Sequence, residues 1–430
     1  MSEKLRKVFE RNPYIVLFFI SLISGIILYY RFIFEGEILA YSAWGSDTRQ
    51  SYLPTYEFWY NKIISGRFSV YDFSYGWGTN IFPVLWGIAD PFSGIPILLS
   101  LFLGVNFIGK TIVWSQIAKS CIISLLGMKF FEKIGYSYES AIIPSYIMGY
   151  CGYMIVTGSH YFFATYAVYF MCILLLTEEI LQNPKLNFKL SGAIAALGIL
   201  SAYALFQTAM LIAIYSVLRP IILKNNLKAY FGSLLNVVES SIIGVLLSML
   251  GLLPQVYNIF IVSQRTKTSV TLIEQFKNAC VLLPKTFVRE EIFNLFSSNL
   301  YGSINNYLGD NGARFCTTPY FFGIVFPSAL LYLFYKTVRN AKKDKTSVIK
   351  CIILILVIIL FFSSFYILLS NIFVYLQWRF VFTVIPFMAW IIVDFIEDIL
   401  NGKKINILII LCPTVLSLVI YKKCNLEIDT

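Results

Sequence analysis

Residues 44–54 read WGSDTRQSYLP and place three polar side chains just after a long apolar run. The carboxylate of Asp47 can accept a proton as a general base, and Arg49 can bind a phosphate through two hydrogen bonds. The amide of Gln50 can donate to or accept from the same ligand. A structural interpretation is also open, in which Asp47 is the N-cap of a helix and Gln50 its third residue. The two are compatible, because a capped helix is a rigid support for a catalytic group.

A glycine-rich aromatic segment follows at 71–80, YDFSYGWGTN. Its glycines permit tight backbone geometry beside a ligand, and Tyr75 and Trp77 offer flat faces for a sugar ring. Asn80 adds an amide at the end of the segment. An aromatic belt at the membrane surface with turn glycines explains these residues equally well.

A second carboxylate, Asp90, lies in GIADPFSGIP, where it is either a functional group or the cap of the helix that Pro91 begins. Asp47 and Asp90 are the residues that would ligate Mg²⁺ or Mn²⁺, but two acidic residues do not establish a metal site, so no cofactor is assigned. His160, the only histidine, excludes a multi-histidine metal centre. It is either a polar group of a binding site or an interfacial histidine.

The composition is strongly apolar, with 58% hydrophobic, 17% aromatic and only 13% charged residues among 430. Soluble domains carry roughly 25% charged residues, so this chain has too few charged residues to cover the surface of a water-soluble protein. The first apolar run, Tyr14 to about Phe34, is too long for a signal peptide and lacks a cleavage site, which predicts a retained helix. Further spans are expected at roughly 108–128, 140–157, 163–180, 190–203, 206–223, 231–253, 318–336, 347–369, 380–399 and 405–421.

These runs predict an all-α polytopic membrane protein with about 11 transmembrane helices. The segment 91–104 is too short to cross and suits a re-entrant or interfacial helix. Basic residues at 4–11 place the N-terminus inside, and every later cluster falls on the same side. These lie at 129–133, 185–189, 219–228, 339–345 and 403–404. Loop lysines facing anionic lipids account for most of the net charge of +11, so no nucleic-acid partner is expected.

Two segments are too long to be simple connections, about 35–107 and about 255–317, and both are predicted outside. Their many aromatic residues predict folded, interfacial layers on a single integral membrane domain, 1–430. Cys280 and Cys316 share the second loop, where an oxidising compartment would permit a disulfide.

The order of several motifs resembles a known family. WGSDTRQSYLPTYEFWYNKIISG is followed by FSYGWGTNIF and ADPFSGIPILLSLF, and later by LLPQVYNIFIVSQR, YFFGIVF and LQWRFVF. Together their order and spacing resemble the YfhO family of bacterial membrane proteins over nearly the whole chain. Members are commonly longer, with a soluble outer domain after the helices, so the resemblance implies a short form. The stretch GSHYFFATY departs from the family pattern, in which Asn and Trp–(Leu/Met)–Asp stand at this place.

The resemblance implies a GT-C-type glycosyltransferase in the bacterial plasma membrane, with its active face outside. The donor would be a polyprenyl-phosphate-linked sugar, and the acceptor a cell-envelope glycopolymer such as teichoic acid or a polysaccharide. Asp47 would be the catalytic carboxylate and Asp90 the second candidate. Arg379 would hold the carrier phosphate, unless it is a snorkelling flank residue, and Arg265 and Arg314 are weaker candidates of the same kind.

Two alternatives belong to other functional classes. A transporter or flippase for a lipid-linked glycan would carry ionisable residues at mid-membrane depth and broken helices. Lys119, Glu239 and Pro386 are candidates for such features, and Lys119 and Glu239 could equally form a pair between helices. A non-catalytic partner in envelope assembly is the second alternative. Most polar residues of interest lie in the outer loops, which favours the enzyme.

Overall fold

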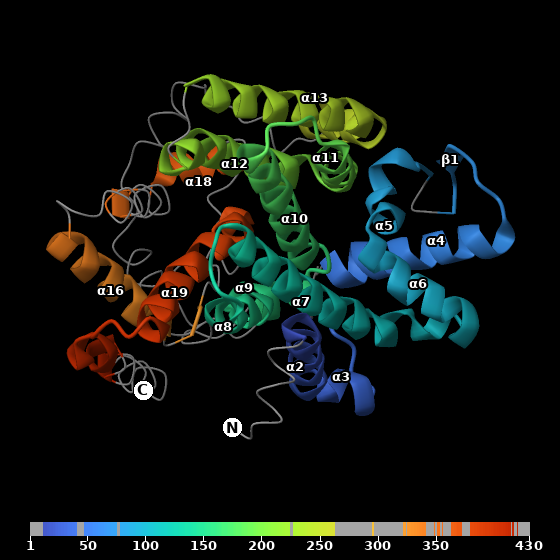
Figure 1. Ribbon diagram of the computed structural model, residues 1–430. Coiled ribbons are helices and arrows are strands. Elements are labelled where there is room, and N and C mark those ends of the chain that lie inside the picture. The colour runs from blue at the N-terminus through green and yellow to red at the C-terminus, as the bar shows by residue number, and fades with distance from the viewer. Residues whose placement is uncertain are drawn as a thin grey trace. The chain divides into compact units, whose positions relative to one another are not determined.

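The computed structural model describes residues 12–40, 47–74, 78–223, 227–262, 321–323, 325–340, 363–371 and 379–413, with isolated positions at 295, 348, 351–352, 355, 415–416 and 419. Most of these residues are helical (Figure 1). The chain divides into two compact units. The first comprises 1–126, 157–216 and 226–267, and the second 127–156, 217–225 and 268–430. The predicted Cys280–Cys316 disulfide lies outside the described residues.

The predicted first span is helical, with a short interruption at Tyr29 between α2 (Pro13–Leu28) and α3 (Tyr30–Phe34). Pro13 suits the first turn of α2, where a backbone N–H has no partner within the helix. One stripe of α2 is buried, and large apolar side chains such as Phe19 and Ile27 are exposed. An exposed face of this kind suits contact with lipid.

The segment predicted as the first outer loop is folded rather than extended. It contains a π-helical turn and four short helices, η1 (Thr48–Tyr52), α4 (Leu53–Ser65), η2 (Phe82–Val84), α5 (Trp86–Ala89) and α6 (Pro91–Leu103). Gly66 ends α4 in the left-handed conformation, φ 63°, which glycine adopts at little cost. A hairpin follows, in which β1 (Tyr71–Asp72) pairs antiparallel with β2 (Thr79–Asn80), with Tyr71 opposite Asn80.

The longest helices of the first unit are apolar enough to cross a membrane. They are α7 (Ile108–Lys133), α10 (Phe163–Gln182), α12 (Ala202–Ile222) and α13 (Leu227–Tyr257), of which α7 and α12 continue into the second unit. Helix α13 continues as the π-helical η5 (Asn258–Val262). Among the described residues, five stretches have the length and hydropathy of a membrane span. These helices are consistent with the predicted all-α membrane protein, whereas the number of eleven crossings and their orientation stay predictions.

The shorter helix α11 (Phe188–Leu200) is separated from α12 by one extended residue, Ser201. Gln255 of α13 satisfies the backbone at this break. Its Oε1 accepts from the N–H of Ala202 at 2.8 Å, and its Nε2 donates to the carbonyl of Ile199 at 2.7 Å. Since α11 packs along α13, the break is held by tertiary contacts (Figure 1).

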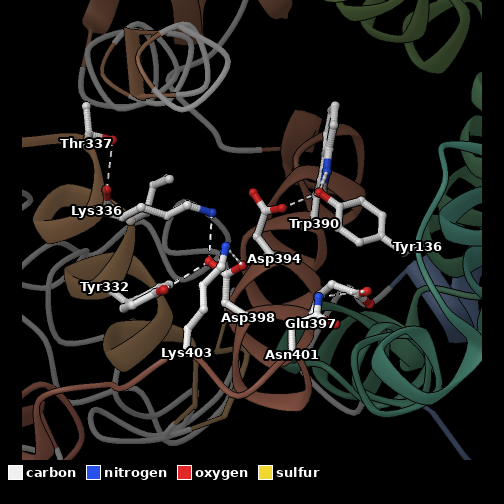
Figure 2. Close-up of polar contacts among 11 residues, drawn as sticks. Tyr136, Tyr332, Lys336, Thr337, Trp390, Asp394, Glu397, Asp398, Asn401 and Lys403 are labelled. Carbon is white, nitrogen blue, oxygen red and sulfur yellow. Dashed lines mark hydrogen bonds and ion pairs between the residues drawn. The ribbon is translucent and has the colours of Figure 1, made fainter. Parts of the chain in front are cut away.

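In the second unit, α19 (Ile385–Leu400) packs against α8 (Tyr138–Gly149) and α16 (Val325–Asn340). The other described elements of this unit are α9 (Gly152–Val156), α18 (Ser364–Ser370) and η7 (Arg379–Thr383). Asp398 of α19 accepts from Tyr332 at 2.9 Å and Lys336 at 2.7 Å, both on α16, and from Lys403 at 2.5 Å (Figure 2). These bonds fasten α19 to α16 within the unit.

Candidate functional site

Asp47 stands at the start of the π-helical turn η1, with its side chain 63% exposed. Its backbone is already helical, and its carboxylate makes no capping hydrogen bond. Asp47 thus occupies the N-cap position of η1, as one of the two interpretations expects, but its side chain does not cap the helix. Arg49 and Gln50 follow on the same turn and are also exposed. The turn thus presents a carboxylate, a guanidinium and an amide to the surroundings.

The short helix η4 (Thr157–Ser159) lies directly beside this group, and the chain turns after it at 160–161, so residues 159–161 are called the turn 159–161. Thr48 donates from Oγ1 to the carbonyl of Ser159 at 3.1 Å, and the Tyr52 hydroxyl is 3.0 Å from Nδ1 of His160. Nδ1 of His160 lies 3.9 Å from Oδ2 of Asp47. That distance is too long for a hydrogen bond but short enough for an ion pair when the imidazole is protonated. His160 itself is buried, so the pair joins an exposed carboxylate to an imidazole behind it.

Asp90 differs sharply from Asp47, because it is only 1% exposed. It caps α6 by accepting from the N–H of Phe92 at 3.0 Å, and its other oxygen accepts from the Thr165 hydroxyl at 3.0 Å. Burial raises the pKa of Asp90, and the positive charge of Lys119 opposes that rise. The capping interpretation of Asp90 is confirmed, and its burial argues against contact with a substrate.

Lys119 is the positive partner of this buried carboxylate. It lies on α7, is 2% exposed, and places its ammonium 5.5 Å from the centre of the Phe92 ring. Its Nζ also donates to the carbonyl of Tyr161. Glu239, considered from the sequence as a partner, is exposed on α13. Lys119 therefore serves the Asp90 site and the turn that carries His160.

An aromatic cluster lies against this turn. Tyr56 stacks on Tyr161 at 5.9 Å and 19°, while Phe162 contacts Tyr52 at 4.5 Å and Trp86 at 5.0 Å. Burial raises the pKa of the Tyr56 hydroxyl well above its ordinary value, with the charge of Asp90 adding to the rise. Aromatic contacts of this kind stabilise a packed core beyond the apolar area that they bury. The packing of this cluster therefore stabilises the positions of η1 and the turn 159–161.

Sequence reasoning missed the meeting of η1 with the turn 159–161. The two hydrogen bonds between these segments join Thr48 to Ser159 and Tyr52 to His160, which lie 111 and 108 positions apart in the sequence. No local sequence pattern connects residues so far apart. The available signal was composition: His160 is followed by Tyr161, Phe162 and Phe163, an aromatic run like those of the first outer loop.

Comparison with known proteins agrees with the helical membrane fold. The family model described as "Bacterial membrane protein YfhO" matches residues 16–427, nearly the whole chain. The chain belongs to the YfhO family. Comparisons with curated proteins and with solved structures gave no match. Membership of the YfhO family makes this a membrane protein of the cell envelope.

Of the other predicted site residues of this YfhO-family chain, the structure describes only Asn80 and Arg379. Tyr75, Trp77, Arg265 and Arg314 lie outside the described residues. The carboxamide oxygen of Asn80 accepts from the N–H of Phe82 at 3.0 Å, an arrangement typical of a turn.

Arg379 begins η7 in the second unit, so its proposed hold on a carrier phosphate stays a prediction. Within the described part of the chain, no three histidine, cysteine, aspartate or glutamate side chains are grouped to hold a metal ion. A role for Mg²⁺ or Mn²⁺ at Asp47 stays untested.

Proposed function

We propose that this YfhO-family protein is a membrane glycosyltransferase that moves a sugar from a polyprenyl-phosphate carrier to a cell-envelope acceptor. We place the reaction at the outer face of the plasma membrane. The observation that carries the proposal is the exposed carboxylate of Asp47, held 3.9 Å from the buried His160 on a turn that also presents Arg49. A general base must be accessible to the acceptor, and the exposed carboxylate of Asp47 meets this condition.

In the proposed reaction, the acceptor hydroxyl oxygen attacks the anomeric carbon of the donor sugar. The bond from that carbon to the carrier phosphate breaks, and the polyprenyl phosphate leaves with the electron pair. Asp47 accepts the hydroxyl proton as the new glycosidic bond forms. An arginine stabilises the charge on the departing phosphate. Arg49 is suited by its place on η1, and Arg379 stays the candidate predicted from the sequence.

The two predicted carboxylates, Asp47 and Asp90, differ in burial, and we therefore propose different roles for them. Asp47 is 63% exposed and can reach a substrate, whereas Asp90 is 1% exposed and engaged through both oxygens. We therefore assign the proton transfer to Asp47 alone, and we assign Asp90 to the support of the site.

The test uses purified protein in liposomes, supplied with a panel of radiolabelled polyprenyl-phosphate sugars and with envelope glycopolymer acceptors. We expect Asp47→Asn to slow transfer by about 10²–10⁴-fold, the range for loss of a general base. Glu57→Gln is the matched control, because Glu57 is an exposed carboxylate in the same loop, on α4. Transfer by the Asp47 variant at the rate of the control would remove Asp47 from the mechanism.

A transporter for a lipid-linked glycan is the second candidate, favoured by the interruption of one apolar stretch at Ser201 and by the buried charge of Lys119. The same liposomes separate the two functions. Movement of the labelled lipid between leaflets, without transfer of sugar from any donor in the panel, would support transport and overturn the enzyme.

A further inference from the structure

The turn 159–161 is held from three directions. Thr48 donates to the carbonyl of Ser159, and Lys119 donates to the carbonyl of Tyr161. The hydroxyl of Tyr161 donates to the carbonyl of Leu39 at 2.7 Å. His160 lies between the two carbonyls that are bound, so the position of its ring depends on both contacts. Lys119 is the only charged group among these three donors.

A buried lysine is costly, because an ammonium loses its hydration inside a protein or a membrane. An apolar side chain of similar length, such as methionine, would fill the same space on α7 without that cost. The structure offsets the charge of Lys119 with Asp90, which the Thr165 hydroxyl and the N–H of Phe92 hold in place. Buried ionic groups are weak contributors to stability, but they can specify one arrangement of the groups around them.

We propose that Lys119 is a positioning residue, which fixes the Tyr161 carbonyl and so holds His160 against Asp47, with Asp90 as its counter-charge. Lys119 touches neither the proposed substrate nor Asp47, and it acts through the turn. The consequence for reaction rate rests on the proposed glycosyl transfer. The consequence for the position of His160 does not.

The imidazole ring of His160 can be observed selectively by NMR, because His160 is the only histidine in the sequence. Protein labelled with ¹³C,¹⁵N-histidine, purified without a histidine tag and placed in lipid nanodiscs, gives ring signals from His160 alone. Asp47→Asn provides the reference, since a change 3.9 Å from Nδ1 must move these signals. Lys110→Met is the matched control, an exposed lysine on the same helix α7.

We expect Lys119→Met to move the His160 signals beyond their linewidth, while Lys110→Met leaves them in place. Because Lys119→Met leaves Asp90 buried without its counter-charge, the double variant Lys119→Met, Asp90→Asn is measured as well. The double variant buries no charge, so it tests the position of His160 even if the single variant fails to fold. His160 signals at the wild-type position in the double variant would overturn the proposal.

Transfer kinetics give the second readout. A displacement of about 1 Å costs up to about 10²-fold in rate, so we expect kcat of the double variant to fall by 10- to 100-fold with KM little changed. Unchanged kcat together with unmoved His160 signals would refute the positioning role. Moved signals in a protein whose wild type transfers no sugar would leave the positioning role standing and refute the proposed function.

Discussion

The contact of α11 with α13 gives a quantitative prediction about packing. Gly244 of α13 faces α11 so closely that an added Cβ would lie 2.7 Å from the carbonyl oxygen of Ser191 and 2.8 Å from Cβ of Ile194. Real Cβ atoms do not come so near to other heavy atoms. Because the obstacle at Ser191 is backbone, a side-chain rotation cannot relieve it, and Gly244→Ala must push the helices apart.

The cost can be isolated with a control. Overpacking of this kind costs about 1–3 kcal/mol, while replacing a helical glycine by alanine gains up to about 1 kcal/mol from helix propensity. Gly232 lies on the same helix, and a Cβ added there would have no heavy atom of a neighbour within 4 Å. Gly232→Ala has the same propensity gain without the clash. The difference between the two variants is therefore the overpacking cost of about 1–3 kcal/mol.

The measurement is the apparent melting temperature of each variant, purified in the same detergent and heated at the same rate. We expect Gly244→Ala to melt several degrees below Gly232→Ala, at about 2–4 °C for each kcal/mol in a domain of 150–250 residues. Gly192→Ala on α11, also free of nearby atoms, is a second control. Equal melting temperatures for all three variants would show that α11 and α13 do not pack in this way.

Three further predictions use the same thermal assay. Gln255→Leu removes the side-chain amide that hydrogen-bonds the backbone at the α11–α12 break. We expect the free energy of unfolding to fall by about 1–3 kcal/mol. An unchanged melting temperature would show that the break does not need Gln255. Lys336→Met should lower the free energy of unfolding by about 1.5–3 kcal/mol, because Lys336 is only 15% exposed at Asp398. Lys403→Met should lower it by under about 1 kcal/mol, because Lys403 is 54% exposed. A larger loss for Lys403→Met than for Lys336→Met would contradict the argument from burial. Asp90 has a folded pKa above its ordinary 3.8, so the folded chain keeps a proton that the unfolded chain releases. Stability should therefore fall as pH rises from about 4 through the folded pKa, and a scan between pH 4 and 7 should show a smaller fall for Asp90→Asn.

Apolar runs in the sequence predicted the described helices well, because an unbroken run of about 20 apolar residues has few alternatives to a membrane helix. The expected spans 108–128 and 163–180 correspond to α7 and α10, with ends displaced by a few residues. The segment 91–104 is the short helix α6, as its length predicted. The break at Ser201 was only weakly indicated, because the nearby sequence has no Asn or Asp turn signal and Gln255 stabilises the break from another helix.

The site was predicted in part, and the limits have physical causes. The position of Asp47 before the first residue of a helix was visible in the sequence, but the absence of a capping bond from its carboxylate was not, because the backbone there enters a π-helical turn. The cap at Asp90 was visible because a helix cap depends only on neighbours in sequence. The contacts of His160 with Tyr52 and of Lys119 with Tyr161 depend on how distant helices pack, and no local pattern encodes them.

The long separation between η1 and the turn 159–161 has a consequence for biosynthesis. Thr48 finds Ser159 only after 111 further residues have been made, which takes about 5–20 s at the usual rate of chain synthesis. During that interval η1 has been made, but the turn, α10 and two of the five residues of the aromatic cluster, Tyr161 and Phe162, have not. Until then, Tyr52, Tyr56 and Trp86 lack the ring contacts that Tyr161 and Phe162 make with them in the folded chain. Stalling the ribosome before and after residue 161 would separate an unprotected loop from a protease-resistant one.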